Sequence, residues 1–393
     1  MKLKYALIVL FTMYYTGIAI AEDTKGIQFR HITLEEAVAA AKKEHKYVFV
    51  HGFADWCSHC KTMAETVYTD SLLGKFYNEN YVCLKIDMEK EGKELAKKMR
   101  INSYPALIYF DENGGVVHRA KGERKIPEMA EMGRDAKDPK KNMRYYENTF
   151  NAGTATIQES YIYLRLLGMA GVDNQYKLNS FLSKQPLDQL TTPEYWRFIS
   201  DFLTDPTLAI AQTFMDNKKA FEAKFTADSV NSKITGMYIS DMMKKIQKLD
   251  TMAYEQQKMG LMHSKLDIAE KICAYADLTT FRIKAQWPQY IAAAPAFIEK
   301  YCATDAKKLN EAAQQYAERA SDPKDIANAE KWAKKSVELM DIYKYNMTLT
   351  SVLVKAGKKE DALATAKHAL ELGKKANIDT KQVMLVIEKM ETP

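Results

Sequence analysis

The chain has 393 residues, a formal net charge of +6 and a hydrophobic content of 47%. This length suggests two or three domains, and five cysteines are too few for a fold built on a disulfide framework. Because the positive charge is modest and no arginine-rich tract is present, nucleic acid is excluded as an expected partner.

The first 21 residues begin with lysines, continue with an uncharged apolar stretch over residues 5–20 and end in a small-x-small pattern at Ala21. This order predicts a secretory signal peptide over residues 1–21, cut after Ala21. An uncleaved membrane anchor is the alternative, but the stretch is shorter than the roughly 20 residues that cross a bilayer. We expect an exported protein of the bacterial periplasm, without stable membrane insertion after cleavage.

Residues 29–135 alternate helix and strand signals. Thr33 and Glu36 form the capping-box pattern at the start of a helix. The run YVFVHGF at 47–53 then predicts a central strand buried on both faces, because it is almost entirely apolar. The cysteine motif that follows predicts a helix running towards Tyr77.

The remaining strand signals follow in the same region. A strand at 81–88 and a helix at 92–100 lead to a third strand at the end of SYPALIYF. The segment DENGG at 111–115 is a tight-turn signal, and VVHRAKG at 116–122 follows it as a fourth strand. The order predicts a parallel β-α-β unit followed by a hairpin, which is an α/β fold.

From residue 139 onward the strand signals disappear and helix follows helix. We predict a helical domain over 139–304 and repeated helices over 305–393. The segments 329–340 and 362–373 line up at an offset of 33 residues, with alanines spaced four apart. This period resembles the tetratricopeptide repeat, and generic helical packing is the alternative.

The stretch HGFADWCSHCKTM places Cys57 and Cys60 directly after the predicted central strand. A structural zinc site needs four ligands, and the chain has no second cysteine pair. A purely structural disulfide would close a very short loop, which removes little entropy from the unfolded chain. A redox centre is the third interpretation, and it is supported by the expected chemistry of the two positions. The start of a helix favours a thiolate at Cys57, which would be the nucleophile. Cys60 lies one turn away and would be the resolving thiol. We therefore expect no metal and no cofactor other than the redox-active disulfide itself.

These features together resemble the thioredoxin superfamily, in particular the soluble thioredoxin-like domains of bacterial cell envelopes. The resemblance rests on FADWCSHCK, the strand before it, the later SYP tripeptide and Gly122, and we assign the domain to residues 22–138. It implies that Trp56 belongs to the redox motif. It also implies a cis bond between Tyr104 and Pro105 opposite the cysteines, with the Tyr104 backbone free to pair with a substrate chain.

The sequence departs from the superfamily at two buried positions. His51 stands where many thioredoxins carry an acidic residue, and Cys83 aligns with the lysine that pairs with that acid. His51 either relays a proton near neutral pH or is a neutral core histidine. His59, between the two cysteines, is expected to stabilise the Cys57 thiolate, which predicts a reduction potential above that of ordinary thioredoxin.

The other cysteines have simpler interpretations. Cys83 is either a small core residue or a third redox thiol. Cys273 and Cys302 lie in the helical half, where they could form a structural disulfide after export.

The sequence predicts an exported thiol:disulfide oxidoreductase that acts on cysteines of envelope or secreted proteins. Its partners would be protein thiols and disulfides of clients, together with a redox protein that resets the active site. The helical region would bind a client or that partner. The alternative is a non-catalytic scaffold in which the helical array binds peptides, and the direction of the redox chemistry is left open.

Overall fold

The structure is a computed structural model that describes residues 26–392, so the predicted signal peptide lies outside the described residues. The chain divides into two compact units. The first contains the residues up to Phe181 together with Arg197–Phe202, and the second contains Leu182–Trp196 and the chain from Leu203 onward. Between residues 26 and 392, no helix has both the length and the apolar character needed to cross a bilayer.

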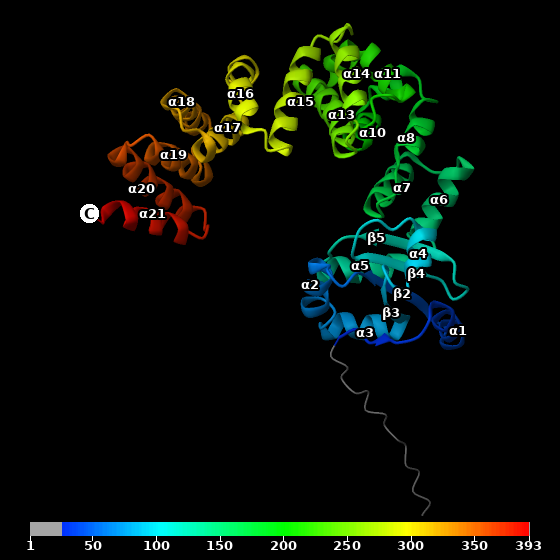
Figure 1. The fold of residues 1–393 in the computed structure, drawn as a ribbon. Coiled ribbons are helices and arrows are strands. Elements are labelled where there is room, and N and C mark those ends of the chain that lie inside the picture. The colour runs from blue at the N-terminus through cyan, green and yellow to red at the C-terminus, as the bar shows by residue number, and fades with distance from the viewer. Residues whose placement is uncertain (1–25, 393) are drawn as a thin grey trace, which may run out of the picture. The chain divides into compact units, whose positions relative to one another are not determined.

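The first unit is built on a five-stranded sheet with the order β1-β3-β2-β4-β5 (Figure 1). Its strands are β1 (Phe29–Arg30), β2 (Tyr47–Phe53), β3 (Tyr81–Asp87), β4 (Ala106–Phe110) and β5 (Val116–Lys121). β2 pairs with β3 in parallel and with β4 in antiparallel orientation, and β4 pairs antiparallel with β5. The predicted β-α-β unit and hairpin are confirmed; β1, only two residues long, was not predicted.

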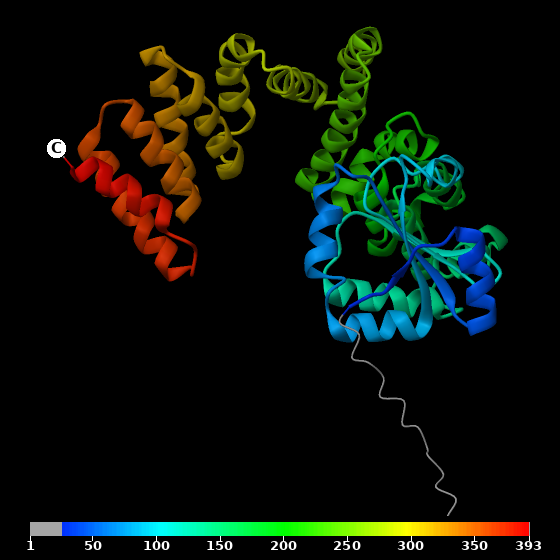
Figure 2. The ribbon, with the colours of Figure 1, turned by 60° about the horizontal axis from the view of Figure 1, so that its bottom comes forward.

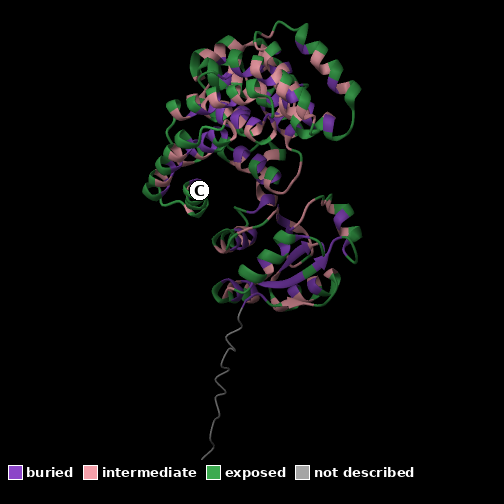
Figure 3. Cartoon of the chain, turned by 60° about the vertical axis from the view of Figure 1, so that its left-hand side comes forward, coloured by how far each residue is buried: buried purple, intermediate pink, exposed green. Residues whose placement is uncertain are grey.

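Helices cover both faces of this sheet. They are α1 (Leu34–Glu44), α2 (Ser58–Thr66), α3 (Ser71–Asn80), α4 (Lys93–Met99) and α5 (Ile126–Lys137). α1 and α4 pack on one face around Val48 and Val50, and α2, α3 and α5 pack on the other around Phe49. Figure 3 shows the strands as the most continuously buried segments, as expected for a sheet covered on both sides.

Polar groups buried beneath α3 and α5 are paired. Tyr77 Oη lies 2.8 Å from Tyr109 Oη and donates to the carbonyl of Met129 at 2.8 Å, while Tyr81 Oη donates to the carbonyl of Gly133. These bonds connect α3, β3, β4 and α5 through side chains that are otherwise aromatic. The large tyrosine content of this core therefore leaves no unpaired hydroxyl among these residues, which would be costly in an apolar interior.

Local signals account for the ends of several elements. The capping box is confirmed, because the Glu36 N–H donates to Thr33 Oγ1 and the Thr33 N–H donates to Glu36 Oε2. In the hairpin turn Gly114 has a φ of +79°, and the Asp111 side chain accepts from the N–H groups of Asn113 and Gly115.

The helix predicted from the cysteine motif to Tyr77 is wrong in its length, because the chain forms two helices there. α2 ends at Thr66 and α3 starts at Ser71, with the Asp70 side chain accepting from the Leu73 N–H at 2.7 Å. The Tyr68 carbonyl, between the two helices, accepts from the Ile27 N–H at 2.7 Å. A side-chain cap thus begins the second helix, and a contact from a distant segment holds the residues between the two.

In the described chain after α5, all regular elements are helices. They are α6 (Met143–Ala152), α7 (Ile157–Met169), α8 (Gln175–Leu182), α9 (Leu187–Leu190), α10 (Pro193–Phe202), α11 (Ala209–Asp216), α12 (Lys218–Phe225), α13 (Ala227–Gln247), α14 (Thr251–Met262), α15 (Ala269–Ile283), α16 (Trp287–Tyr301), α17 (Ala306–Arg319), α18 (Pro323–Leu339), α19 (Tyr343–Lys355), α20 (Lys359–Lys375) and α21 (Lys381–Glu391). The predicted fold class, an α/β thioredoxin-like sheet followed by an all-helical region, is confirmed.

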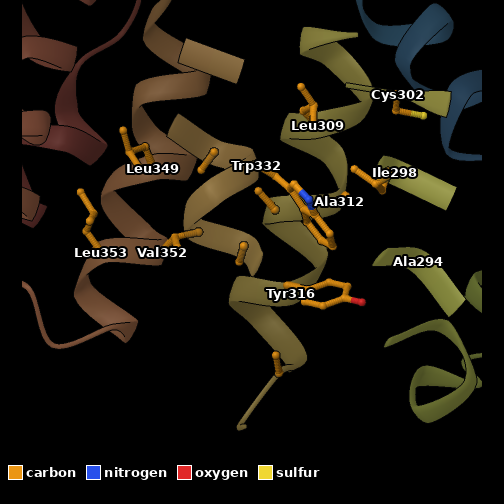
Figure 4. Close-up of a cluster of buried hydrophobic side chains, with 14 of the residues drawn as sticks. Ala294, Ile298, Cys302, Leu309, Ala312, Tyr316, Trp332, Leu349, Val352 and Leu353 are labelled. Carbon is orange, nitrogen blue, oxygen red and sulfur yellow. The ribbon is translucent and has the colours of Figure 1, made fainter. Parts of the chain in front are cut away.

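The last helices of the second unit share one apolar core. Figure 2 shows α18 to α21, orange to red, as neighbouring helices. Trp332 and Tyr316 are fully buried at the centre of this core, with their rings 4.9 Å apart (Figure 4). The alanines of the internal repeat are buried where helices meet, at Ala333, Ala362 and Ala366. Small side chains at these positions let the helices approach closely.

Two glycine positions in helices predict opposite effects of the same substitution. A Cβ atom at Gly74 in α3 would come within 2.3 Å of the Gly26 backbone, whereas a Cβ at Gly236 in α13 would meet nothing within 4 Å. We expect Gly74→Ala to lower the free energy of unfolding by about 1–3 kcal/mol through overpacking. Gly236→Ala should raise it by about 0.5–1 kcal/mol through helix propensity. Urea unfolding followed by circular dichroism measures both, and equal effects would contradict the assigned packing.

Candidate functional site

The redox motif lies where the central strand ends. β2 ends at Phe53, and after a short turn the Cys57 N–H donates to the Ala54 carbonyl at 3.0 Å. Cys57 is the N-cap residue of α2, and its Sγ accepts from the Cys60 N–H at 3.1 Å. Cys57 and Cys60 are joined by a disulfide, with their Cα atoms 5.3 Å apart.

This position gives the two sulfurs different surroundings. The Cys57 sulfur caps the start of α2 by accepting from the Cys60 N–H, at the end of the helix where the dipole favours negative charge. Cys60 lies within the first turn of the same helix. Both residues are only 3% exposed in the disulfide form, whereas the neighbouring Trp56 is 68% exposed. A thiolate released at Cys57 would therefore be stabilised by an amide that is already in contact with its sulfur.

The segment before β4 lies beside the motif. The Tyr104–Pro105 bond is cis, as the resemblance implied. The rings of Tyr104 and Trp56 are in contact, with their centroids 5.7 Å apart. The Pro105 carbonyl accepts from the Gly122 N–H at 2.8 Å, while the Tyr104 N–H and carbonyl form no backbone hydrogen bond within the described chain. Trp56 is held in turn by Glu89, which accepts from its indole Nε1 at 3.0 Å. The Tyr104 backbone is thus available next to an exposed indole.

The imidazole of His59 pairs with a carboxylate outside the Cys-x-x-Cys motif. Its Nδ1 lies 2.7 Å from Glu123 Oε2, and His59 and Glu123 are 69% and 39% exposed at their side chains. Glu123 follows Gly122 in the loop after β5, and the sequence offered no signal for it because the two residues are 64 positions apart. Because the carboxylate holds one imidazole nitrogen, any effect of His59 on the cysteines depends on Glu123.

His51 is completely buried on the face of β2 that packs against α2 and α3, and burial lowers its pKa to about 3. The phenol of Tyr68 lies 2.5 Å from His51 Nδ1. Burial raises the pKa of Tyr68, so the phenol keeps its proton and donates it to Nδ1. The remaining ring proton belongs on Nε2, which has no partner within the described residues. This geometry favours a neutral histidine, and Tyr68 is a second residue that sequence reasoning did not identify.

Cys83 lies in the middle of β3 and does not pair with His51 across the sheet. In the parallel pairing of β2 with β3, Cys83 stands opposite Phe49, and Lys85 stands opposite His51. Cys83 is buried in the aromatic core, and burial raises the pKa of its thiol well above the ordinary range. Both observations support a core residue, because a thiol held protonated is a poor nucleophile.

The disulfide considered between Cys273 and Cys302 is not formed, and both residues are free and buried. The Cys273 thiol, on α15, donates to the Lys258 carbonyl of α14 at 3.7 Å. Cys302, just after α16, is part of the C-terminal core with Ile298 and Leu309. Each thiol therefore packs as a small apolar side chain in its own surroundings. Over residues 26–392, no three His, Cys, Asp or Glu side chains are grouped so as to hold a metal ion.

Comparison with known proteins agrees with this geometry. Residues 34–137 match the family described as Thioredoxin-like domain. The chain is 29% identical over 89 residues to a protein disulfide-isomerase of Hordeum vulgare, covering 22% of this chain and 17% of that protein. It is 30% identical over 99 residues to the thiol:disulfide interchange protein DsbD of Ralstonia nicotianae, covering 23% of this chain and 16% of that protein. The chain thus spans about a sixth of the length of these two relatives.

Among solved structures, a candidate disulphide-isomerase from Bacteroides thetaiotaomicron has 38% sequence identity to the chain. The match covers 29% of this chain and 98% of that protein, with a TM-score of 0.27. The family match over residues 34–137 and the Cys57–Cys60 disulfide show a thioredoxin-like domain with a Cys-x-x-Cys pair, and a long helical region follows it.

The two buried histidines predict that stability decreases in mild acid. Burial lowers the pKa of His51 to about 3 and that of His118 to about 4, so both stay neutral in the folded protein while the unfolded chain takes up protons below its ordinary pKa near 6.5. The free energy of unfolding should fall by about 1–2 kcal/mol per histidine between about pH 7 and pH 5.

Urea unfolding at several pH values measures this slope. His118→Phe should remove about half of the contribution that the two histidines make. Replacing the exposed His263 in the same way is the matched control, and it should leave the slope unchanged. Equal slopes for wild type and His118→Phe would contradict the assignment of buried neutral histidines.

Proposed function

We propose that the protein is an exported thiol:disulfide oxidoreductase in which Cys57 exchanges with cysteines of other envelope or secreted proteins and Cys60 resolves the intermediate. The observation that carries the proposal is the contact of the Cys57 sulfur with the Cys60 N–H at the start of α2, inside the same disulfide. The similarity of this domain to disulfide isomerases and DsbD supports the same chemistry.

The exchange proceeds in two displacements. In the oxidising direction a client thiolate attacks the Cys57 sulfur, the Cys57–Cys60 bond breaks and Cys60 leaves as a thiolate. A second client thiolate then attacks the client sulfur of the mixed disulfide, which forms the client disulfide and releases Cys57. The client loses two electrons and the pair gains them. Reduction is the same sequence in reverse, and the redox partner that resets the pair decides the direction.

We propose that a client chain binds beside the disulfide, along the Tyr104 segment. The Tyr104 backbone has no partner within the described residues, so an extended client segment could pair with it as an added strand. Trp56 and Tyr104 offer an aromatic surface next to the sulfurs. The helical region, which we propose to contain tetratricopeptide-like pairs, would hold the client or the resetting protein, since arrays of paired helices form extended binding surfaces.

Trapping of mixed disulfides tests the proposal. In Cys60→Ala the intermediate on Cys57 cannot be resolved from within, so clients should accumulate as complexes that reducing agent releases. Non-reducing electrophoresis and mass spectrometry of the protein isolated from its host identify them. Cys57→Ala/Cys60→Ala is the control and should trap nothing. If Cys60→Ala also traps nothing, the protein is better described as the alternative scaffold whose helical array binds peptides.

Glu123 allows a test of how His59 acts. Removing the carboxylate in Glu123→Gln frees the imidazole to stabilise the Cys57 thiolate, which should favour the dithiol and make the disulfide more oxidising. Because both side chains are partly exposed, we expect only about a two- to fivefold change in the equilibrium constant with glutathione.

The matched control is the same substitution in a His59→Gln background, where Glu123 has no imidazole to compete for. There Glu123→Gln should change the equilibrium little, so the two effects are not additive. Equal effects in both backgrounds would show that Glu123 acts on the cysteines independently of His59.

A further inference from the structure

The first unit contains a pocket of about 570 Å³ between α4, β5, α6 and α7. This volume lies in the range of small-molecule sites, roughly 300–1,000 Å³. α6 and α7 lie beyond residue 137, where the match to the thioredoxin-like family ends. The pocket therefore depends on the helices that this chain adds to that domain.

Arg119, on β5, is the central charged group of the pocket. Its side chain is half-buried, and its Nη1 donates to the Met99 carbonyl at the end of α4 at 3.0 Å. No ion pair joins its guanidinium to a carboxylate within the described chain, although Glu147 lies near enough to influence it. Burial lowers the pKa of Arg119, which reflects the cost of keeping this charge out of water. A half-buried cation without an ion-pair partner is a favourable position for a bound anion.

The other charged groups that line the pocket leave an excess of cations. Lys98 and Arg100 form no ion pair within residues 26–392, whereas Arg144 is paired with Asp111 at 2.5 Å. The acidic side chains that line it, Glu147 and Asp173, already accept hydrogen bonds, from Tyr163 and from the Gln175 N–H. Three unpaired cations thus face two carboxylates that are already partly satisfied.

The remaining walls include apolar side chains, and a second, smaller hollow adjoins them at Arg119. Met99, Leu167 and Val172 contribute apolar surface. A smaller hollow of about 20 Å³ shares Arg119 with the pocket and is lined by Ser103, whose buried hydroxyl has no partner within the described residues. A ligand with one anionic end and an apolar body matches these walls.

We propose that this pocket binds a small monocarboxylic acid, with its carboxylate on Arg119 and its apolar body against Leu167 and Val172. A guanidinium presents two parallel N–H groups that match the two oxygens of a carboxylate. Asn102, which lines the pocket, lies two residues before Tyr104, so the ligand would lie near the segment that flanks the redox motif.

Calorimetric titration of the full chain with octanoate tests the site. Octanoate should bind to wild type, and octanamide, which has the same body without the charge, should bind about tenfold more weakly or not at all. Acetate, which has the charge without the body, should also bind weakly. Octyl phosphate distinguishes a site for carboxylates from one for any anion, and tighter binding of the phosphate would overturn the assigned ligand class.

Two variants localise the binding. Arg119→Met should weaken octanoate binding by about tenfold or more, since a charge-assisted hydrogen bond is lost. Val172→Phe keeps Arg119 and fills the pocket from a loop, so it should weaken binding even if Arg119→Met fails to fold. Arg134→Gln, an exposed arginine on α5, is the matched control and should bind as wild type does. No binding to wild type, or unchanged binding to both pocket variants, would overturn the proposal.

Discussion

The position of β2 is the constraint on which the site depends. This strand is paired on both edges and buried on both faces, so it can neither slide nor rotate without breaking two ladders and exposing both cores. Its end brings the chain to the start of α2, where Cys57 caps the helix through its sulfur. The position of the disulfide is therefore set by backbone hydrogen bonds and apolar packing, and one amide of the helix contacts the Cys57 sulfur.

The two histidines near the motif, His51 and His59, do not set the position of the disulfide and could change only its redox equilibrium. His51 is buried and hydrogen-bonded to Tyr68, and because burial lowers its pKa to about 3 it adds no charge to this core at neutral pH. His59 is exposed, and its Nδ1 lies 2.7 Å from Glu123 Oε2. Because the Cys60 N–H contacts the Cys57 sulfur directly whereas His59 pairs with Glu123, His59 should influence the redox equilibrium less than its place between the cysteines suggests.

Sequence patterns predicted those features that neighbouring residues determine. The almost entirely apolar β2, the Thr33–Glu36 capping box and the Gly114 turn are all encoded within a few positions, and the structure confirms each of them. The contacts of His51 with Tyr68 and of His59 with Glu123 join residues 17 and 64 positions apart, and no local pattern records such pairings. The break between α2 and α3 was missed although its cap is local, since Asp70 accepts from the Leu73 N–H three positions on.

The helices that follow the matched domain begin as part of its structure. β5 is the last strand of the sheet, and an uncovered edge exposes backbone groups that invite association. Arg144 of α6 donates from its Nε to the Val116 carbonyl of β5, and the Met143 N–H donates to His118 Nδ1 on the same strand. α6 thus supplies partners to the edge strand, and with α7 it encloses the pocket around Arg119. A thioredoxin-like domain without these helices would lack that pocket, so any ligand bound there would be specific to proteins that carry the helical extension.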